Sequence, residues 1–138
     1  CKLIYSDGNS TEQICPAPNG WSVKITDTGS VSWYEFYNKM YILNTLEQIV
    51  NISDLGLFPN VTNGRIEWHI TNKNTINGII FRMTAQNEQN ILTSRLFVLK
   101  ITNDQFSYCG WAKSNAEARL LLKKTSNCRS LDATNREN

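Results

Sequence analysis

The sequence predicts an α+β fold: a single antiparallel sheet of five or six strands, with helices packed on that sheet and two disulfides. Three observations lead to this prediction. Several short segments alternate apolar and polar residues, which is the period of a half-buried strand. A capping box precedes a segment of strong helix formers, and four cysteines are spaced so that they close two short loops. At 138 residues the chain has the length of one domain, so residues 1–138 are expected to fold as a single unit.

The first predicted elements are a hairpin and a helix. Residues 21–37 alternate apolar and polar side chains around the turn-forming residues 26–29, which is typical of a β-hairpin. In residues 38–50 the apolar positions recur at helical spacing, which predicts a helix of about three turns. These positions are Met40, Leu43, Leu46, Ile49 and Val50.

Four further strands are predicted after a loop that covers residues 51–64. Polar turns separate these strands, so neighbouring strands are expected to pair as an antiparallel meander. The third strand has apolar residues on both faces, which places it at the centre of the sheet. The four segments are residues 65–72, 76–85, 91–102 and 106–112.

The last predicted element is a helix over residues 115–124. Ser114 and Glu117 have the spacing of a capping box, and Lys123 and Lys124 suit the negative end of the helix dipole. A helix of about ten residues is marginal by itself. It is therefore expected to dock its leucines on the sheet, namely Leu120, Leu121 and Leu122. The complete order of elements resembles the profilin-like and sensory-domain layouts, in which a sheet carries helices on one face.

The cysteines indicate a compartment outside the reducing cytosol. Their order favours the pairs Cys1–Cys15 and Cys109–Cys128, although four cysteines allow three connectivities. Structural disulfides persist in oxidising surroundings, and a chain that begins at Cys1 without methionine is expected once a signal peptide has been removed. The protein is therefore expected to be extracytoplasmic, in the periplasm, at the cell surface or secreted. The alternative is a cytosolic protein with free buried cysteines.

Cys1 has a second interpretation. A cysteine at the mature N-terminus is what a bacterial lipoprotein carries, with lipid on its sulfur. A lipid anchor would leave Cys15 as an odd thiol in an oxidising compartment. The Cys1–Cys15 disulfide is therefore favoured over the lipid anchor.

The charge balance argues against two classes of partner. With 14 basic and 12 acidic residues the formal charge is +2, which is too balanced for nucleic acid or an anionic membrane as the main partner. No apolar run reaches the roughly 20 residues that a membrane-spanning helix needs. The expected partner is another protein.

Residues suited to catalysis are few and form no recognisable motif. His69 is the only histidine, and a Ser-His-Asp arrangement would need Ser94 or Ser107 from neighbouring strands. A pair of carboxylates, as in glycosidases, would come from the set Glu35, Glu47, Asp54 and Glu67. No catalytic site, cofactor-binding motif or metal-ligand spacing is predicted, so we do not expect an enzyme.

Leu57 and Phe58 are candidates for binding a partner. They are apolar residues in an otherwise polar loop, and exposed apolar loop residues often mark a docking site. The alternative is that this loop, with Leu55 and Val61, is a lid over the open edge of the core.

Arg65, Arg82 and Arg95 are a second set of candidates, because they fall on three successive predicted strands. With His69 and Lys100 they would line one face of the sheet as a surface for anions or an acidic partner. The alternative is a solvated face on which basic and acidic residues alternate.

The function we expect first is that of a non-catalytic exported module that binds another protein, such as an inhibitor, an immunity protein or a subunit of an envelope assembly. The first alternative is an extracytoplasmic sensor domain for a small ligand or a carbohydrate, which the order of elements and the four tryptophans favour. The second alternative is a small hydrolase that uses His69 or a pair of carboxylates.

Overall fold

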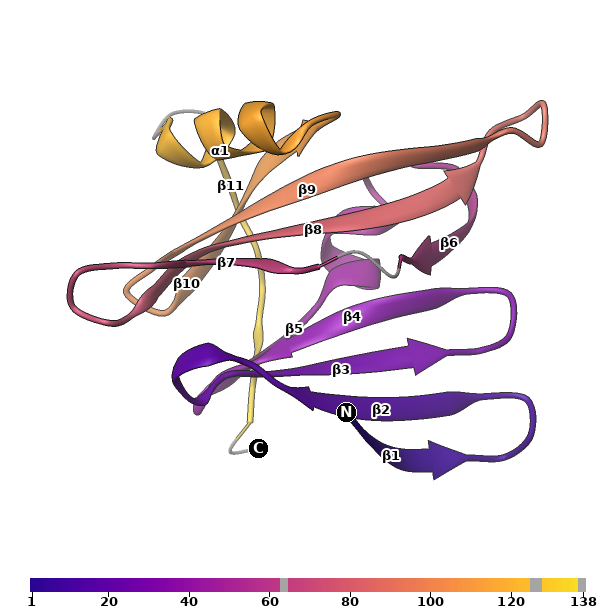
Figure 1. Ribbon diagram of the computed structural model, residues 1–138, viewed down its shortest axis with the longest axis horizontal. Coiled ribbons are helices and arrows are strands. Elements are labelled where there is room, and N and C mark those ends of the chain that lie inside the picture. Colours follow the sequence, from indigo (N-terminus) through magenta and orange to yellow (C-terminus); the bar gives the residue numbers. More distant parts are fainter. Residues whose placement is uncertain (63–64, 125–127, 137–138) are drawn as a thin grey trace.

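The structure is a computed structural model that describes residues 1–62, 65–124 and 128–136. Its strands form two antiparallel sheets of six strands each, which Figure 1 shows as separate layers. In this part of the chain there is one α-helix, α1 (Asn115–Lys123), which packs on the second sheet on the side away from the first.

The first sheet takes its strands from the N-terminal third of the chain and one from the C-terminus. In spatial order they are β1 (Lys2–Ser6), β2 (Thr11–Pro16), β3 (Ser22–Asp27), β4 (Ser32–Tyr37), β5 (Tyr41–Asn44) and β12 (Thr134–Asn135). The hairpin predicted for residues 21–37 is confirmed as β3 and β4. A short 3-10 turn, η1 (Pro18–Gly20), connects β2 to β3. The hairpin of β1 and β2 was not predicted, and every residue of β1 is exposed.

The second sheet contains the predicted four-stranded meander. Its strands are β6 (Leu57–Val61), β7 (Glu67–Ile70), β8 (Ile76–Gln86), β9 (Leu92–Thr102), β10 (Gln105–Ala112) and β11 (Arg129–Ser130). β8, β9 and β10 pair in sequence order, and both β6 and β7 pair with the free side of β8. β9 lies in the interior of the sheet and is covered on both faces, as its apolar pattern predicts. β6 lies in the segment that was predicted to be a loop.

The predicted single sheet with two helices is wrong. Residues 38–50 form β5 and one turn of π-helix, η2 (Leu46–Val50), instead of an α-helix. The side-chain Oδ1 of Asn38 accepts hydrogen bonds from the backbone N–H groups of Met40 and Tyr41, at 2.8 and 2.7 Å, which closes a tight turn into β5. Leu43 is then buried as a strand residue, opposite Phe36 of β4. The inner faces of these strands stack on the meander and share one core with it, as in a β-sandwich.

The main core lies between the two sheets and is rich in aromatic rings. Phe36 of β4 and Phe81 of β8 have ring centroids 5.4 Å apart, and Phe81 lies 5.6 Å from Phe97 of β9. All three side chains are fully buried. Because a fully buried side chain of this kind contributes about 1.5–3 kcal/mol, the contact between the sheets is the main source of stability.

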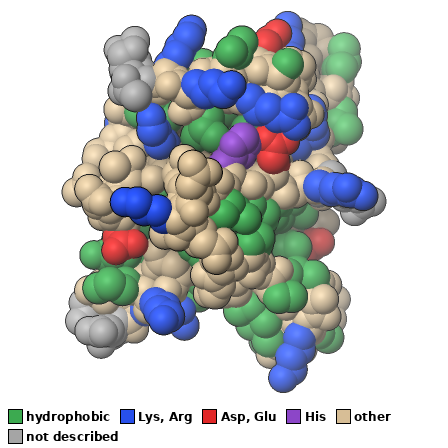
Figure 2. Space-filling view, turned by 60° about the vertical axis from the view of Figure 1, so that its left-hand side comes forward, with side chains coloured by type: hydrophobic (Ala, Val, Ile, Leu, Met, Phe, Trp, Pro, Cys, Tyr) green, Lys and Arg blue, Asp and Glu red, His purple; other side chains and the backbone are tan. Residues whose placement is uncertain are grey.

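α1 forms a second, smaller core on the outer face of the second sheet. Ser114 accepts a hydrogen bond from a backbone N–H of the first turn at 3.2 Å, which confirms the predicted N-cap. Ala118 and Leu122 are buried against the sheet, but Leu120 remains 59% exposed, so its predicted docking is wrong. Gly78 of β8 permits this close approach, since a Cβ atom there would lie 2.6 Å from Leu122 Cδ2. Figure 2 shows basic side chains gathered over this helical layer, at the top of the view.

Both predicted disulfides are present, Cys1–Cys15 and Cys109–Cys128. The first disulfide uses the sulfur that a lipid anchor at Cys1 would need. Of the two interpretations of Cys1, the structure therefore supports the disulfide. Beyond the second disulfide, β11 pairs with β10 and β12 pairs with β5, so the C-terminal segment connects the two sheets. Two disulfides fit an extracellular location. Among the described residues, no helix has the length and apolar character needed to cross a membrane.

Candidate functional site

Residues 51–61, which lead from η2 into β6, divide into a buried part and an exposed part. Leu55 is only 4% exposed and belongs to the main core, against which Val61 also packs. Leu57 and Phe58, by contrast, are 60% and 51% exposed. The lid interpretation therefore applies to Leu55 and Val61, whereas Leu57 and Phe58 are available at the surface.

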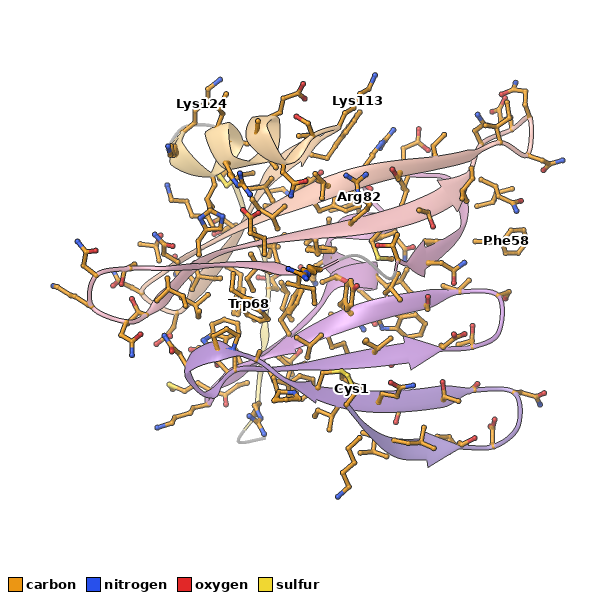
Figure 3. The ribbon with its side chains drawn as sticks, viewed as in Figure 1. Cys1, Phe58, Trp68, Arg82, Lys113 and Lys124 are labelled. Carbon is orange, nitrogen blue, oxygen red and sulfur yellow. A yellow bond between two sulfur atoms is a disulfide. The ribbon has the colours of Figure 1, made fainter. Side chains whose placement is uncertain are left out.

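Phe58 has a left-handed backbone conformation, with φ 53°, which bulky residues rarely adopt. It lies where the pairing of β6 with β8 is irregular, between Leu57 and Asn60. The side-chain Nδ2 of Asn60 donates to the carbonyl oxygen of Phe58 at 2.9 Å and to that of Ser30 at 3.1 Å. The Oδ1 of Asn60 accepts from Ser32 Oγ at 2.8 Å, so β4 holds this bend in place. Figure 3 shows the ring of Phe58 standing away from β6. Because the ring of Phe58 is half exposed, the strained backbone at this residue does not serve the packing of the core.

Two more exposed apolar residues lie at the same end of the second sheet. Ile91 and Leu92, at the start of β9, are 60% and 66% exposed. Leu57 and Leu92 are both paired with Gln86 of β8, one on each side. We call Leu57, Phe58, Ile91 and Leu92 the β6-end patch. Ile91 and Leu92 were predicted to be part of a covered strand, so their exposure was not predicted.

A groove of about 670 Å³ lies beside the β6-end patch and includes Leu57 in its lining. Arg95 and Trp111 form part of its wall, with the guanidinium carbon 4.1 Å from the centroid of the Trp111 ring. Arg95 Nη1 also donates to the carbonyl oxygen of Ser53 at 2.8 Å. This cation–π contact and hydrogen bond hold the guanidinium over the ring, so the groove has a fixed aromatic and cationic wall.

The groove carries charges of both signs. Besides Arg95, its lining includes Lys113, Asp54 and Glu88. Two basic and two acidic residues give the lining no net formal charge. The lining thus combines apolar and aromatic residues with a balanced set of charges.

The three arginines do not form one surface. Arg82 is opposite Leu96, and Arg95 is opposite Met83, so the two arginines lie on opposite faces of the second sheet. Arg82 donates to Ser94 Oγ at 2.8 Å, and Figure 3 shows it on β8. Arg65 is exposed and precedes β7. Of this set, only Arg95 contributes to the groove beside the β6-end patch.

His69 belongs to a polar cluster that links β7 to α1. Its Nε2 lies 2.6 Å from Glu67 Oε2, and Arg119 donates to both carboxylate oxygens of Glu67 at 2.9 and 2.7 Å. These hydrogen bonds from Arg119, with that from His69, lower the pKa of Glu67 to about 2. His69, Glu67 and Arg119 therefore form a polar contact that joins β7 to α1.

The serines considered for a triad do not lie beside His69. Ser94 bonds Arg82 instead. Ser107 lies on β10, and the register runs from His69 through Gly78 and Lys100 to Ser107, so two strands separate it from His69. Over the described residues, no group of three or more His, Cys, Asp or Glu side chains is arranged to hold a metal ion.

Comparison of the chain with family models, with curated proteins and with solved structures found no match.

Proposed function

We propose that this protein is a non-catalytic extracellular module that binds another protein through the β6-end patch and the adjoining groove. The exposure of Leu57 and Phe58 carries the proposal, because neither side chain is needed by the core and Phe58 is held in a costly conformation. A residue in such a conformation costs on the order of 1–3 kcal/mol. A binding partner that covers the ring would offset this cost, because burial of the apolar ring stabilises the complex.

The neighbouring residues have the composition of an interface. Aromatic residues and arginine are enriched at the centres of protein interfaces. Here Trp111 packs on Arg95 in the groove, and Phe58 is exposed next to Leu57, which lines that groove. Covering an apolar side chain that is now half exposed adds roughly 1 kcal/mol. The four residues of the β6-end patch together supply roughly 4 kcal/mol, so contacts in the adjoining groove are needed to exceed the cost of association, which is about 4–15 kcal/mol.

Site-specific cross-linking is the direct test of this proposal. The photoreactive amino acid p-benzoylphenylalanine would replace Phe58 in one protein and Leu120 in another, and both would be irradiated in the extracellular fluid of the source organism. Leu120 is a matched control, since it is at least as exposed as Phe58 but lies on α1. We expect a discrete cross-linked protein from position 58 and none of that mass from position 120. Equal products from both positions, or no product from position 58, would contradict the proposal.

A further inference from the structure

A second cavity lies at the end of the molecule opposite the β6-end patch. It has a volume of about 620 Å³, is open to solvent on one side, and is lined by residues of η1, the β4–β5 turn, the β7–β8 turn and the β9–β10 turn. In Figure 1 the last two turns lie at the left, whereas β6 lies at the right. The size is within the range of small-molecule sites, which is about 300–1,000 Å³. No residue of the β6-end patch contributes to it.

The cavity combines aromatic and aliphatic surface with walls that are mostly uncharged and polar. Trp21, Ile76 and Ile101 supply apolar surface. Asparagine and threonine side chains from all four connections supply most of the rest, together with Asp104 and two lysines. Figure 2, which brings this end of the molecule forward, shows mainly uncharged polar side chains and backbone between scattered charges.

Several polar side chains of this cavity have unused hydrogen-bonding capacity. The side chains of Asn77, Lys100, Asn103 and Asp104 form no hydrogen bond or ion pair with any residue that the structure describes. An asparagine amide provides two donors and an acceptor, and a carboxylate provides acceptors only. Donors and acceptors are thus both available around one apolar floor.

Two sets of contacts hold the walls of the cavity in place. The side-chain Nδ2 of Asn19 donates to the backbone carbonyl of Asn74, which joins η1 to the β7–β8 turn. Trp21 packs edge-to-face against Trp68 and Phe106, with ring centroids 5.9 and 5.8 Å away. A site whose walls are already ordered loses little conformational entropy when a ligand binds.

This chemistry is that of a sugar site. Each sugar hydroxyl is both a donor and an acceptor, which amides and a carboxylate can satisfy together, and the C–H face of a pyranose packs on an indole ring. No arginine or histidine is among the described residues that line the cavity, so the usual bidentate recognition of phosphate or sulfate is missing there. We propose that this cavity binds a neutral carbohydrate of one or two sugar units, with Trp21 as the platform and Asn77, Asn103 and Asp104 as hydrogen-bonding groups. The proposal is independent of the protein-binding function.

The β9–β10 turn offers a variant that removes the sugar contacts without disturbing the fold. Asn103 and Asp104 have φ angles of 50° and 63°, which glycine adopts readily. Asn103→Gly with Asp104→Gly therefore deletes both polar side chains and keeps the turn. Asn90→Gly is the matched control, because Asn90 has φ 61° in the β8–β9 turn at the other end of the molecule.

The test is a calorimetric titration of the full chain with glucose, galactose, mannose, N-acetylglucosamine, cellobiose, lactose and chitobiose. We expect saturable binding of at least one of these sugars and a loss of about tenfold or more in affinity in the Asn103→Gly/Asp104→Gly variant, with no change in Asn90→Gly. The proposal is overturned if no sugar in this panel binds to the folded protein, or if the double variant binds as well as the parent. Binding of a sulfated heparin disaccharide alone, lost above about 0.3 M salt, would also overturn it, since that behaviour marks a charge-driven site.

Discussion

The Cys109–Cys128 disulfide should contribute far more to the free energy of unfolding than the Cys1–Cys15 disulfide. The perturbation is a pair of double variants, Cys1→Ser with Cys15→Ser and Cys109→Ser with Cys128→Ser. The bonded cysteines are 14 and 19 residues apart. In the chain-entropy model loops of such similar length each stabilise by about 3 kcal/mol, so loop length alone predicts nearly equal effects.

The two disulfides differ in what surrounds them, and this difference predicts unequal contributions to the free energy of unfolding. The loop closed by Cys109 and Cys128 contains α1, whose buried residues complete the second core. Without this disulfide the full loss of about 3 kcal/mol is expected. Cys1 instead precedes β1, which is exposed at every residue. β1 can leave β2 without exposing the core, so the loss of this disulfide is expected to lower the free energy of global unfolding by less than about 1 kcal/mol.

Urea unfolding followed by tryptophan fluorescence measures both effects, with hydrogen exchange as a second readout. The variant without the first disulfide should lose protection in the β1 amides while its unfolding midpoint hardly moves. Equal losses of about 3 kcal/mol in the two variants would refute the view that β1 is peripheral to the cooperative unit.

Two further predictions concern contacts between α1 and the second sheet. Gly78→Ala would place a Cβ atom 2.6 Å from Leu122 Cδ2. Urea unfolding should therefore show a loss of about 1–3 kcal/mol in the free energy of unfolding. If the clash with Leu122 causes this loss, adding Leu122→Ala should not increase it. The pKa of Glu67 is lowered from 4.5 to about 2 by Arg119 and His69, so its contribution to stability is present above pH 4.5 and disappears as the pH falls toward 2. Because Arg119 is half exposed, this contribution should be at most about 1 kcal/mol. Glu67→Gln should remove it at pH 7 and flatten the acid limb of the stability profile; a profile that keeps the parent's slope would exclude Glu67 as its origin.

The strands of the meander were predictable from their apolar patterns. Residues 65–72 alternate apolar and polar side chains, whereas residues 91–102 are apolar on both faces, and the order of β7 to β10 follows from these patterns and the polar turns between them. Residues 38–50 misled the prediction because Leu43 and Leu46 happen to have helical spacing, while the turn at Asn38 and the pairing of β5 with β4 decide the outcome. The division into two sheets could not be predicted, since it depends on which faces stack across the core.

The candidate site was predictable only in part. Leu57 and Phe58 were identified as apolar residues in a polar setting, but their exposure depends on the bulge in β6. Leu92 appeared to be covered because its strand is apolar on both faces, yet burial begins only at Leu96. The predicted arginine surface does not form because of the strand register. Arg82 is paired with Leu96, one position beyond Arg95, and a shift of one residue turns a side chain to the other face of the sheet.

The affinity of the cross-linked partner for a Leu57→Ser/Phe58→Ser variant tests the proposed function most directly. Surface plasmon resonance would compare this variant with the parent and with Leu120→Ser, and a thermal melt would confirm that each is folded. We expect the double variant to lose about 100-fold in affinity, as for residues at the centre of an interface, while its melting temperature stays within a few degrees of the parent's and Leu120→Ser binds normally. Unchanged affinity in a folded Leu57→Ser/Phe58→Ser variant would contradict the assignment of the β6-end patch as the binding surface.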